Sequence, residues 1–230
     1  MAVLNWKVGG EVVSKSKCLI KVTDHAQDSE LKLKAEVTSG ADYSNTLKWT
    51  DLNGITESEY IPNYFSVVVD CSGSMSGNRN TSAKDAINEF INHMSEQDKI
   101  NIVGFNNRAS NICDFTSDTD SLRKAVNSIY ASGGTSVSSG MNMSISNFDG
   151  ITEDKSKFNK VMILICDGDV NNCSTAVQKA IESNITVYTI NVVNADVKYL
   201  QEIASQTGGR YYYSNVVSDM TNILHQIKLM

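Results

Sequence analysis

The feature that most constrains the fold is an apolar segment that ends abruptly in oxygen-bearing side chains. Residues 65–70 read Phe-Ser-Val-Val-Val-Asp, and the valine-rich run has the length and composition of a buried parallel strand. The chain continues Cys-Ser72-Gly-Ser74, so two hydroxyls follow the Asp70 carboxylate within four residues. Hard divalent cations such as Mg²⁺ prefer oxygen ligands and usually retain some water. The pattern Asp70-x-Ser72-x-Ser74 therefore indicates part of a metal site at the end of a strand.

The segments after Phe65 alternate between strand-like apolar runs and helical periodicity, which is typical of a three-layer α/β domain. The segment Ile112–Phe115 is expected to return antiparallel at an edge of the sheet. The expected strands are 65–70, 100–105, 112–115, 161–166 and 185–190, and the expected helices are 83–94, 122–129, 137–145, 177–181, 197–204 and 216–229.

Residues 1–60 differ from the rest of the chain in their pattern of apolar and polar residues, which predicts a β-rich extension. Strands are expected at 18–22, 31–37 and 47–50, with the polar residues 23–30 joining the first two as a hairpin-like loop. A small antiparallel sheet is rarely stable alone, so this unit is predicted to pack on the main domain. The single proline, Pro62, marks the boundary, which gives two domains, 1–60 and 61–230. The extension could serve as a structural addition or as a docking platform for a partner.

Composition limits the classes of function. The chain of 230 residues is 41% hydrophobic and 20% charged, as in soluble globular proteins, and its formal net charge is −6. It has no run rich in Lys and Arg, which argues against nucleic-acid binding. Neither an apolar run of the ~20 residues that span a bilayer nor a signal-peptide core is evident. The expected location is cytoplasmic, or secreted if the sequence is a trimmed part of a secreted parent.

The five cysteines are odd in number and form no C-x-x-C pair, which argues against a disulfide framework and a thiolate zinc site. Cys71 and Cys166 adjoin the candidate ligands, but thiolates suit softer metals than Mg²⁺. We expect them to act as small apolar fillers near the buried strand ends.

Two further segments complete a known pattern. A Gly-Gly-Thr135-Ser loop lies between two expected helices, and Asp167 follows the apolar strand 161–166. Together with Asp70-x-Ser72-x-Ser74, these segments resemble the metal-ion-dependent adhesion site (MIDAS) of von Willebrand factor type A (VWA) domains. The alternative for the two serines is that they cap the following helix.

The resemblance, which covers the chain from about Asn63 onward, implies a doubly wound, Rossmann-like fold. Its sheet would be mostly parallel with one antiparallel edge strand, and the strands of Asp70 and Asp167 would lie side by side where strand order reverses. Residues 208–213 resemble the last strand of the family. Ser72, Ser74 and Thr135 would ligate the ion through hydroxyls, while Asp70 and Asp167 would bind directly or through water. The implied ion is Mg²⁺, with Mn²⁺ or Ca²⁺ as alternatives.

The resemblance also implies a function in binding rather than in catalysis. Two carboxylates only about neutralise a divalent ion, so a Glu or Asp of a partner protein can complete its coordination. Among bacterial cytoplasmic relatives the partner is often an AAA+ ATPase or a stress-response complex, whereas secreted relatives bind matrix or surface proteins. In some relatives partner binding moves the last helix, here residues 216–229.

Two alternatives stay open from the sequence. The metal could merely staple three loops of a structural scaffold. Alternatively, Asp167-Gly-Asp169 resembles the start of haloacid-dehalogenase-type phosphohydrolases, in which the two aspartates are nucleophile and acid/base with Mg²⁺. Asn171 departs from that pattern, and Asp70–Ser74 would then have no role. The three histidines occur in no catalytic motif.

Overall fold

A computed structural model describes residues 61–168, 173–193, 197–213 and 227 in full, together with the backbone of four strands within residues 1–60. The chain divides into two compact units, Met1–Tyr60 and Ile61–Met230, and each is described by itself. The strands are β1 (Ala2–Val8), β2 (Glu11–Cys18), β3 (Glu30–Glu36), β4 (Asp42–Lys48), β5 (Asn63–Asp70), β6 (Lys99–Phe105), β7 (Ala109–Thr116), β8 (Asn159–Cys166), β9 (Ile185–Asn191) and β10 (Tyr211–Tyr213). The helices are the short 3₁₀ turn η2 (Gly73–Met75), α1 (Asn78–Asn92), α2 (Thr119–Ser128), α3 (Val137–Asp149), α4 (Ser174–Glu182) and α5 (Lys198–Gln206).

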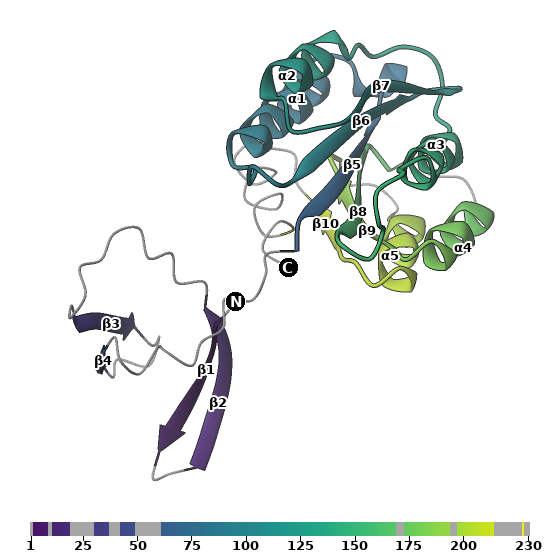
Figure 1. Cartoon of the computed structure of the whole chain (residues 1–230). Coiled ribbons are helices and arrows are strands. Elements are labelled where there is room, and N and C mark those ends of the chain that lie inside the picture. The colour runs from purple at the N-terminus through teal and green to yellow at the C-terminus, as the bar shows by residue number, and fades with distance from the viewer. Residues whose placement is uncertain are drawn as a thin grey trace. The chain divides into compact units, whose positions relative to one another are not determined.

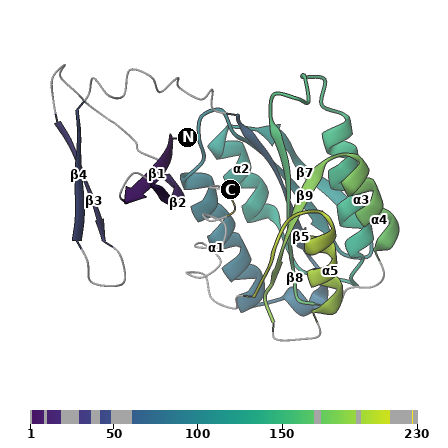
Figure 2. The ribbon, with the colours of Figure 1, turned by 90° about the horizontal axis from the view of Figure 1, so that it is seen from below.

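The larger unit is a three-layer α/β domain. Its six-stranded sheet has the order β10-β9-β8-β5-β6-β7, and every neighbouring pair is parallel except β6 with β7. Helices α1 and α2 cover one face of the sheet, and α3, α4 and α5 cover the other (Figures 1 and 2). The predicted doubly wound fold with one antiparallel edge strand is therefore confirmed. The expected helix 216–229 lies outside the described residues, except for the buried Ile227.

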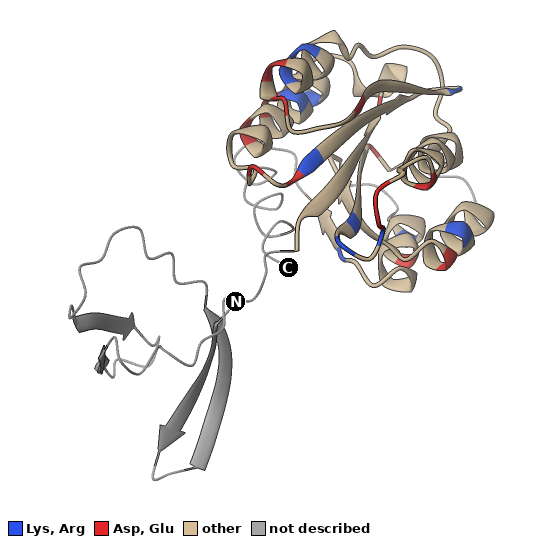
Figure 3. Ribbon diagram, viewed as in Figure 1, with Lys and Arg blue, Asp and Glu red and all other residues tan. Residues whose placement is uncertain are grey.

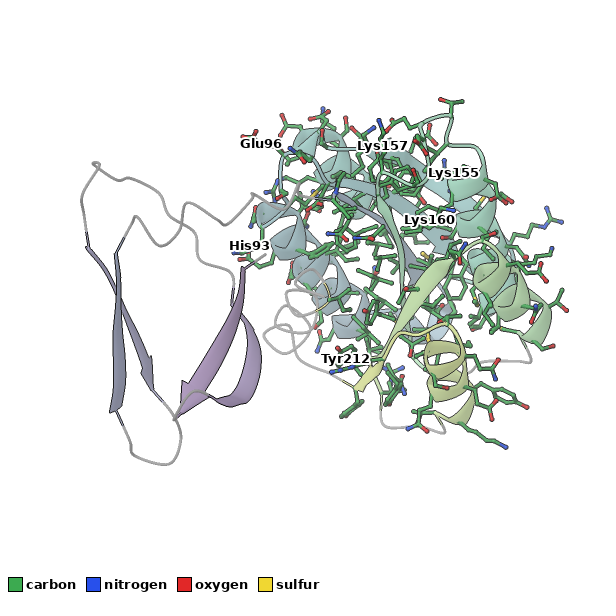
Figure 4. All side chains as sticks on the ribbon, turned by 60° about the horizontal axis from the view of Figure 1, so that its bottom comes forward. His93, Glu96, Lys155, Lys157, Lys160 and Tyr212 are labelled. Carbon is green, nitrogen blue, oxygen red and sulfur yellow. The ribbon has the colours of Figure 1, made fainter. Side chains whose placement is uncertain are left out.

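The central strand β5 supplies both layers of the core. Side chains of a strand alternate between its faces, so Phe65, Val67 and Val69 pack with α1 and α2, whereas Val68 packs with α3. All four are buried, and side chains fill the space on both sides of the sheet (Figure 4). In the described part of the chain, no helix has both the length and the apolar character needed to cross a membrane.

The smaller unit contains two separate antiparallel pairs, β1 with β2 and β3 with β4. Strand β3 agrees with the predicted strand at 31–37. Of the expected strand at 18–22, only Cys18 lies within the described residues, as the last residue of β2, so its pairing with residues 31–37 stays a prediction. The described partner of β3 is β4. The sequence signal for the β1–β2 pair, which was missed, is Gly9-Gly10, a dipeptide typical of two-residue hairpin connections. Of the expected strand at 47–50, residues 47–48 belong to β4, and residues 49–50 lie outside the described residues. Packing of this unit on the main domain stays a prediction.

The charged residues of the larger unit lie mostly on its helices and connecting segments (Figure 3). Lys155, Lys157 and Lys160 gather where β8 begins (Figure 4). Strand β8 has eight residues at about 3.3 Å each. The three lysines are therefore roughly 20 Å or more from Asp167 at its opposite end, too far to neutralise that carboxylate.

Candidate metal site at the carboxyl edge of the sheet

Pairing of β5 with β8 brings two carboxylates to the same edge of the sheet. Val69 lies opposite Ile165 in this parallel pair, so Asp70 is level with Cys166 and Asp167 is the next residue. Strand β6 lies on the other side of β5, so strand order reverses between β5 and β8. Ligands of doubly wound sheets bind at such a reversal. The predicted placement of the two aspartates on adjacent strands is confirmed.

The Asp70 carboxylate is fully buried and only half satisfied. Its Oδ1 accepts a hydrogen bond of 2.7 Å from the Ser72 backbone N–H, but its Oδ2 has no hydrogen-bond partner among the described residues. Burial raises the pKa of Asp70 to about 6, and the charge of Asp167 acts in the same direction. The Ser72 hydroxyl and N–H oppose this rise by stabilising the ionised form. A buried carboxylate in this state gains stability from a proton or a cation.

The two serines converge beside this carboxylate. Ser72 is buried and Ser74 is exposed, and their Oγ atoms lie 2.9 Å apart. The alternative that they cap the following helix is wrong for α1, whose N-cap is Gly77. The side chain of Ser72 makes no capping hydrogen bond to η2 either. Both hydroxyl oxygens are therefore available as ligands.

The loop that carries Thr135 is bonded directly to the serine loop. The Ser132 N–H donates to the Cys71 carbonyl at 2.7 Å, and the Gly73 N–H donates to the Gly133 carbonyl at 2.9 Å. Thr135 follows two residues later, between α2 and α3 as expected. Its hydroxyl makes no hydrogen bond within the described ranges, so it is free to act as a ligand. The structure thus joins the backbones of two predicted ligand loops.

Two asparagines that no motif in the sequence singled out hold this loop in place. Asn107 Oδ1 accepts a 2.6 Å hydrogen bond from the Gly134 N–H, and Asn106 Nδ2 donates to the Ser132 carbonyl at 3.1 Å. Both residues follow β6, the strand beside β5. A polar pair directly after a strand of the same parallel sheet was the signal that could have identified them.

Arg79 is a third residue that sequence reasoning missed. Its Nη1 lies 3.4 Å from Asp167 Oδ2 and donates a 2.8 Å hydrogen bond to the Ser74 carbonyl. The Arg79 side chain is 45% exposed, whereas that of Asp167 is 4% exposed. A cation in the first turn of α1 therefore connects two of the candidate ligand loops. No part of the recognised motif specifies an arginine at this position.

Gly133→Ala is expected to weaken the Thr135 loop. Gly133 has a φ of +78°, and a Cβ there would lie 2.7 Å from Asn107 Oδ1, the acceptor that holds Gly134. Gly208→Ala is the matched control, because Gly208 has a φ of +79° and open space around a Cβ. Thermal unfolding should show a loss of about 1–2 kcal/mol for the control and a larger loss for Gly133→Ala. Equal losses would show that the contact with Asn107 does not matter.

The thiols beside the site are buried. Burial raises the pKa of Cys71 to about 11, and it raises the pKa of the fully buried Cys166 even further. Both thiols are neutral near pH 7 and pack in the two core layers. This agrees with their predicted use as small apolar fillers.

The donor set suits a hard cation. Among the described residues, no group of three or more His, Cys, Asp or Glu side chains is placed to hold a metal ion. The candidate set contains only two carboxylates, and its remaining donors are hydroxyls. A site of this composition would rely on hydroxyl and water oxygens, which Mg²⁺ and Mn²⁺ accept. Asp169 lies outside the described residues.

The fold and this edge define an α/β protein with a doubly wound sheet and a polar crevice at its strand-order reversal. The sequence model of the von Willebrand factor type A domain matches residues 66–227. The chain belongs to this family.

Relatives and solved structures agree with that assignment. The human voltage-dependent calcium channel subunit alpha-2/delta-2 is 25% identical over 157 residues, which cover 64% of this chain and 14% of that protein. This chain thus spans about a seventh of the relative's length. A von Willebrand factor type A structure from Catenulispora acidiphila has a TM-score of 0.65 at 19% identity, covering 73% of this chain and 42% of that one. BatB from Bacteroides thetaiotaomicron has a TM-score of 0.64 at 20% identity and covers 73% and 98% of the two chains. At these identities the structures show the fold alone.

Proposed function

We propose that this protein is a metal-dependent protein-interaction module whose ion is held by Asp70, Ser72, Ser74, Thr135 and Asp167. The observation that carries the proposal is the buried Oδ2 of Asp70, which has no hydrogen-bond partner in the described part of the chain and lies beside two converging serine hydroxyls. Burying such a group during folding costs free energy unless a ligand compensates that cost. Homologous VWA domains are generally interaction or adhesion modules and are mostly not enzymes.

The charge of the proposed site favours an acidic partner. Two carboxylates about neutralise a divalent ion, and the hydroxyls add no charge, so the ion can still attract one more anionic oxygen. Ser74 lies on the surface and Asp167 is buried, so any open coordination position would face the solvent side of the serine loop. We therefore propose that a Glu or Asp side chain of a partner protein fills that position. If the protein is cytoplasmic, we propose an AAA+ ATPase or a stress-response complex as the partner.

The scaffold alternative, in which the metal only staples loops, has less support. The serine loop and the Thr135 loop are already joined by two backbone hydrogen bonds. The side chains of Asn106 and Asn107 add two more bonds to the same loop. A metal is not needed to hold these loops together, so its use would lie in binding a partner.

The phosphohydrolase alternative depends on Asp169, which the structure does not describe. A phosphatase screen that includes Asp169→Asn separates it from the binding proposal. Turnover that disappears in this variant would identify an enzyme and would contradict the binding proposal.

Mg²⁺ or Mn²⁺ is expected to raise the melting temperature of the protein. A ligand that binds only the native state at about 100 times its Kd adds about 2.7 kcal/mol of stability. For a domain of this size, that corresponds to a rise of roughly 5–10 °C. Thermal unfolding with added metal and with chelator measures it. An unchanged melting temperature at millimolar metal would contradict the proposal.

Capture from a host lysate then tests the binding function. The proposal expects a partner that is retained with Mg²⁺ and lost both in chelator and on the Asp70→Asn variant. The same partner retained in chelator would show a metal-free docking surface instead.

A further inference from the structure

Arg79 is the cation in closest contact with the proposed ligands. Of the ion pairs within the described residues, only Arg79–Asp167 involves a proposed ligand, and the same guanidinium also binds the Ser74 carbonyl. One side chain thus connects the serine loop to Asp167, the residue that follows β8. Metal and guanidinium are competing cations for the same carboxylate.

The position of Arg79 in the helix shows what holds it there. Arg79 is the second residue of α1, and the first turn of α1 contains no acidic residue. The N-terminal turn of a helix carries a partial positive charge, which disfavours a cation. The attraction that offsets this repulsion comes from outside the helix, from the Asp167 carboxylate and the Ser74 carbonyl. The contacts with Asp167 and Ser74, rather than the preference of a helix terminus, therefore hold Arg79 in this position.

We infer that Arg79 lowers the affinity of the site for its metal ion by competing for Asp167, and that it sets the metal concentration at which the site fills. The inference rests on the proposed function. With Arg79 in contact, the two carboxylates and the guanidinium sum to one negative charge, whereas without it they sum to two. A divalent ion close to a guanidinium is also repelled by it, and solvent screens this repulsion only in part, because Asp167 is buried although Arg79 is half exposed. Lys155, Lys157 and Lys160 at the other end of β8 (Figure 4) cannot exert a comparable effect.

The test is a titration with Mg²⁺ alone, followed by calorimetry, on the full chain and three variants. Arg79→Gln removes the charge and should bind Mg²⁺ about fivefold or more tightly than the wild type at low ionic strength. Arg79→Lys keeps the charge, so its Kd should lie closer to the wild-type value than to that of Arg79→Gln. At 1 M salt, where charges separated by more than about 3 Å are screened, the difference should shrink.

Arg123→Gln is the matched control for lost charge. Arg123 is partly exposed on α2, and its guanidinium hydrogen-bonds to Asn92, the last residue of α1. Asn92 lies thirteen positions after Arg79 in the same helix, a rise of roughly 20 Å. This variant should bind Mg²⁺ within about twofold of the wild type.

The outcomes separate the inference from the proposed function. An Arg79→Gln affinity equal to or weaker than that of the wild type would overturn the inference while leaving the metal site intact. If the wild type bound no Mg²⁺ but Arg79→Gln did, the competition would be supported and the metal-dependent function of the natural chain would fail. If neither bound, both would fail.

Discussion

Asp70→Asn is expected to stabilise the protein in chelator and to abolish its stabilisation by Mg²⁺. The wild-type carboxylate is fully buried, one of its oxygens has no partner in the described structure, and a second carboxylate follows the neighbouring strand. An amide has the same shape without the charge, so the cost of burying that charge disappears. We expect a gain of up to about 3 kcal/mol, the equivalent of two pKa units. Thermal unfolding in chelator and in Mg²⁺ measures both effects.

The dependence of stability on pH follows from the same carboxylate. In the folded protein burial raises the Asp70 pKa to about 6 from an ordinary value of 3.8. As pH rises from about 4 to about 6, the unfolded chain therefore releases this proton before the folded chain does. Without metal, the contribution of Asp70 to the free energy of unfolding falls across that window. The Asp70→Asn variant should lack this component.

Asp98→Asn is the matched control with the opposite expected sign. Asp98 is also fully buried, but its two oxygens accept hydrogen bonds from the backbone N–H groups of Asn63 and Ser95, at 2.9 and 3.0 Å. An amide nitrogen facing one of these donors should cost about 1–3 kcal/mol. Destabilisation by Asp70→Asn in chelator, to the extent seen for Asp98→Asn, would show that the Asp70 carboxylate is structural.

Gly140→Ala is expected to destabilise the domain and to weaken metal binding together. A Cβ at Gly140 in α3 would lie 2.7 Å from Phe105 Cδ1 and 2.9 Å from Val68 Cγ1, both in fully packed strands. Overpacking of this kind costs about 1–3 kcal/mol, against a gain of up to about 1 kcal/mol in helix propensity. Helix α3 begins two residues after Thr135, so a displaced helix also moves the proposed ligand. Unfolding and Mg²⁺ titration should both show the loss.

Gly150→Ala tests whether that effect is specific to the helix–sheet contact. Gly150 ends the same helix in a right-handed helical conformation, and a Cβ there would make an ordinary 3.5 Å contact with the Ser146 carbonyl oxygen. We expect its stability within about 0.5 kcal/mol of the wild type. If both variants behaved alike, the close approach of α3 to the sheet would not be required.

The sequence was sufficient to predict the fold of the larger unit because each of its helices and strands has a recognisable pattern of apolar residues. The apolar segment 65–70 and its counterpart 161–166 could only be buried on both faces, which requires helices on both sides of a parallel sheet. The short, more polar segment 112–115 correspondingly lies in the edge strand β7. In the smaller unit, alternation identified β3 but could not identify its partner. Register and pairing depend on turns, and the hairpin signal at Gly9-Gly10 was missed.

The proposed site was predictable only where one motif specified it. Asp70, Ser72 and Ser74 are close in sequence, and adjacent parallel strands bring Asp167 to the same edge. The contacts of Arg79 and Asn107 depend on how α1 and the β6–β7 turn lie against that edge, which no spacing in the sequence states. Metal ligation itself stays a prediction.

Anomalous diffraction from crystals of the protein grown with Mn²⁺ would locate the ion itself. One strong peak is expected at the carboxyl edge of β5 and β8, within coordination distance of the hydroxyl oxygens of Ser72 and Ser74. That peak should be absent from crystals of Asp70→Asn. The proposed metal site would be contradicted if crystals with saturating Mn²⁺ gave no peak among Asp70, Ser72, Thr135 and Asp167, or gave a peak only elsewhere.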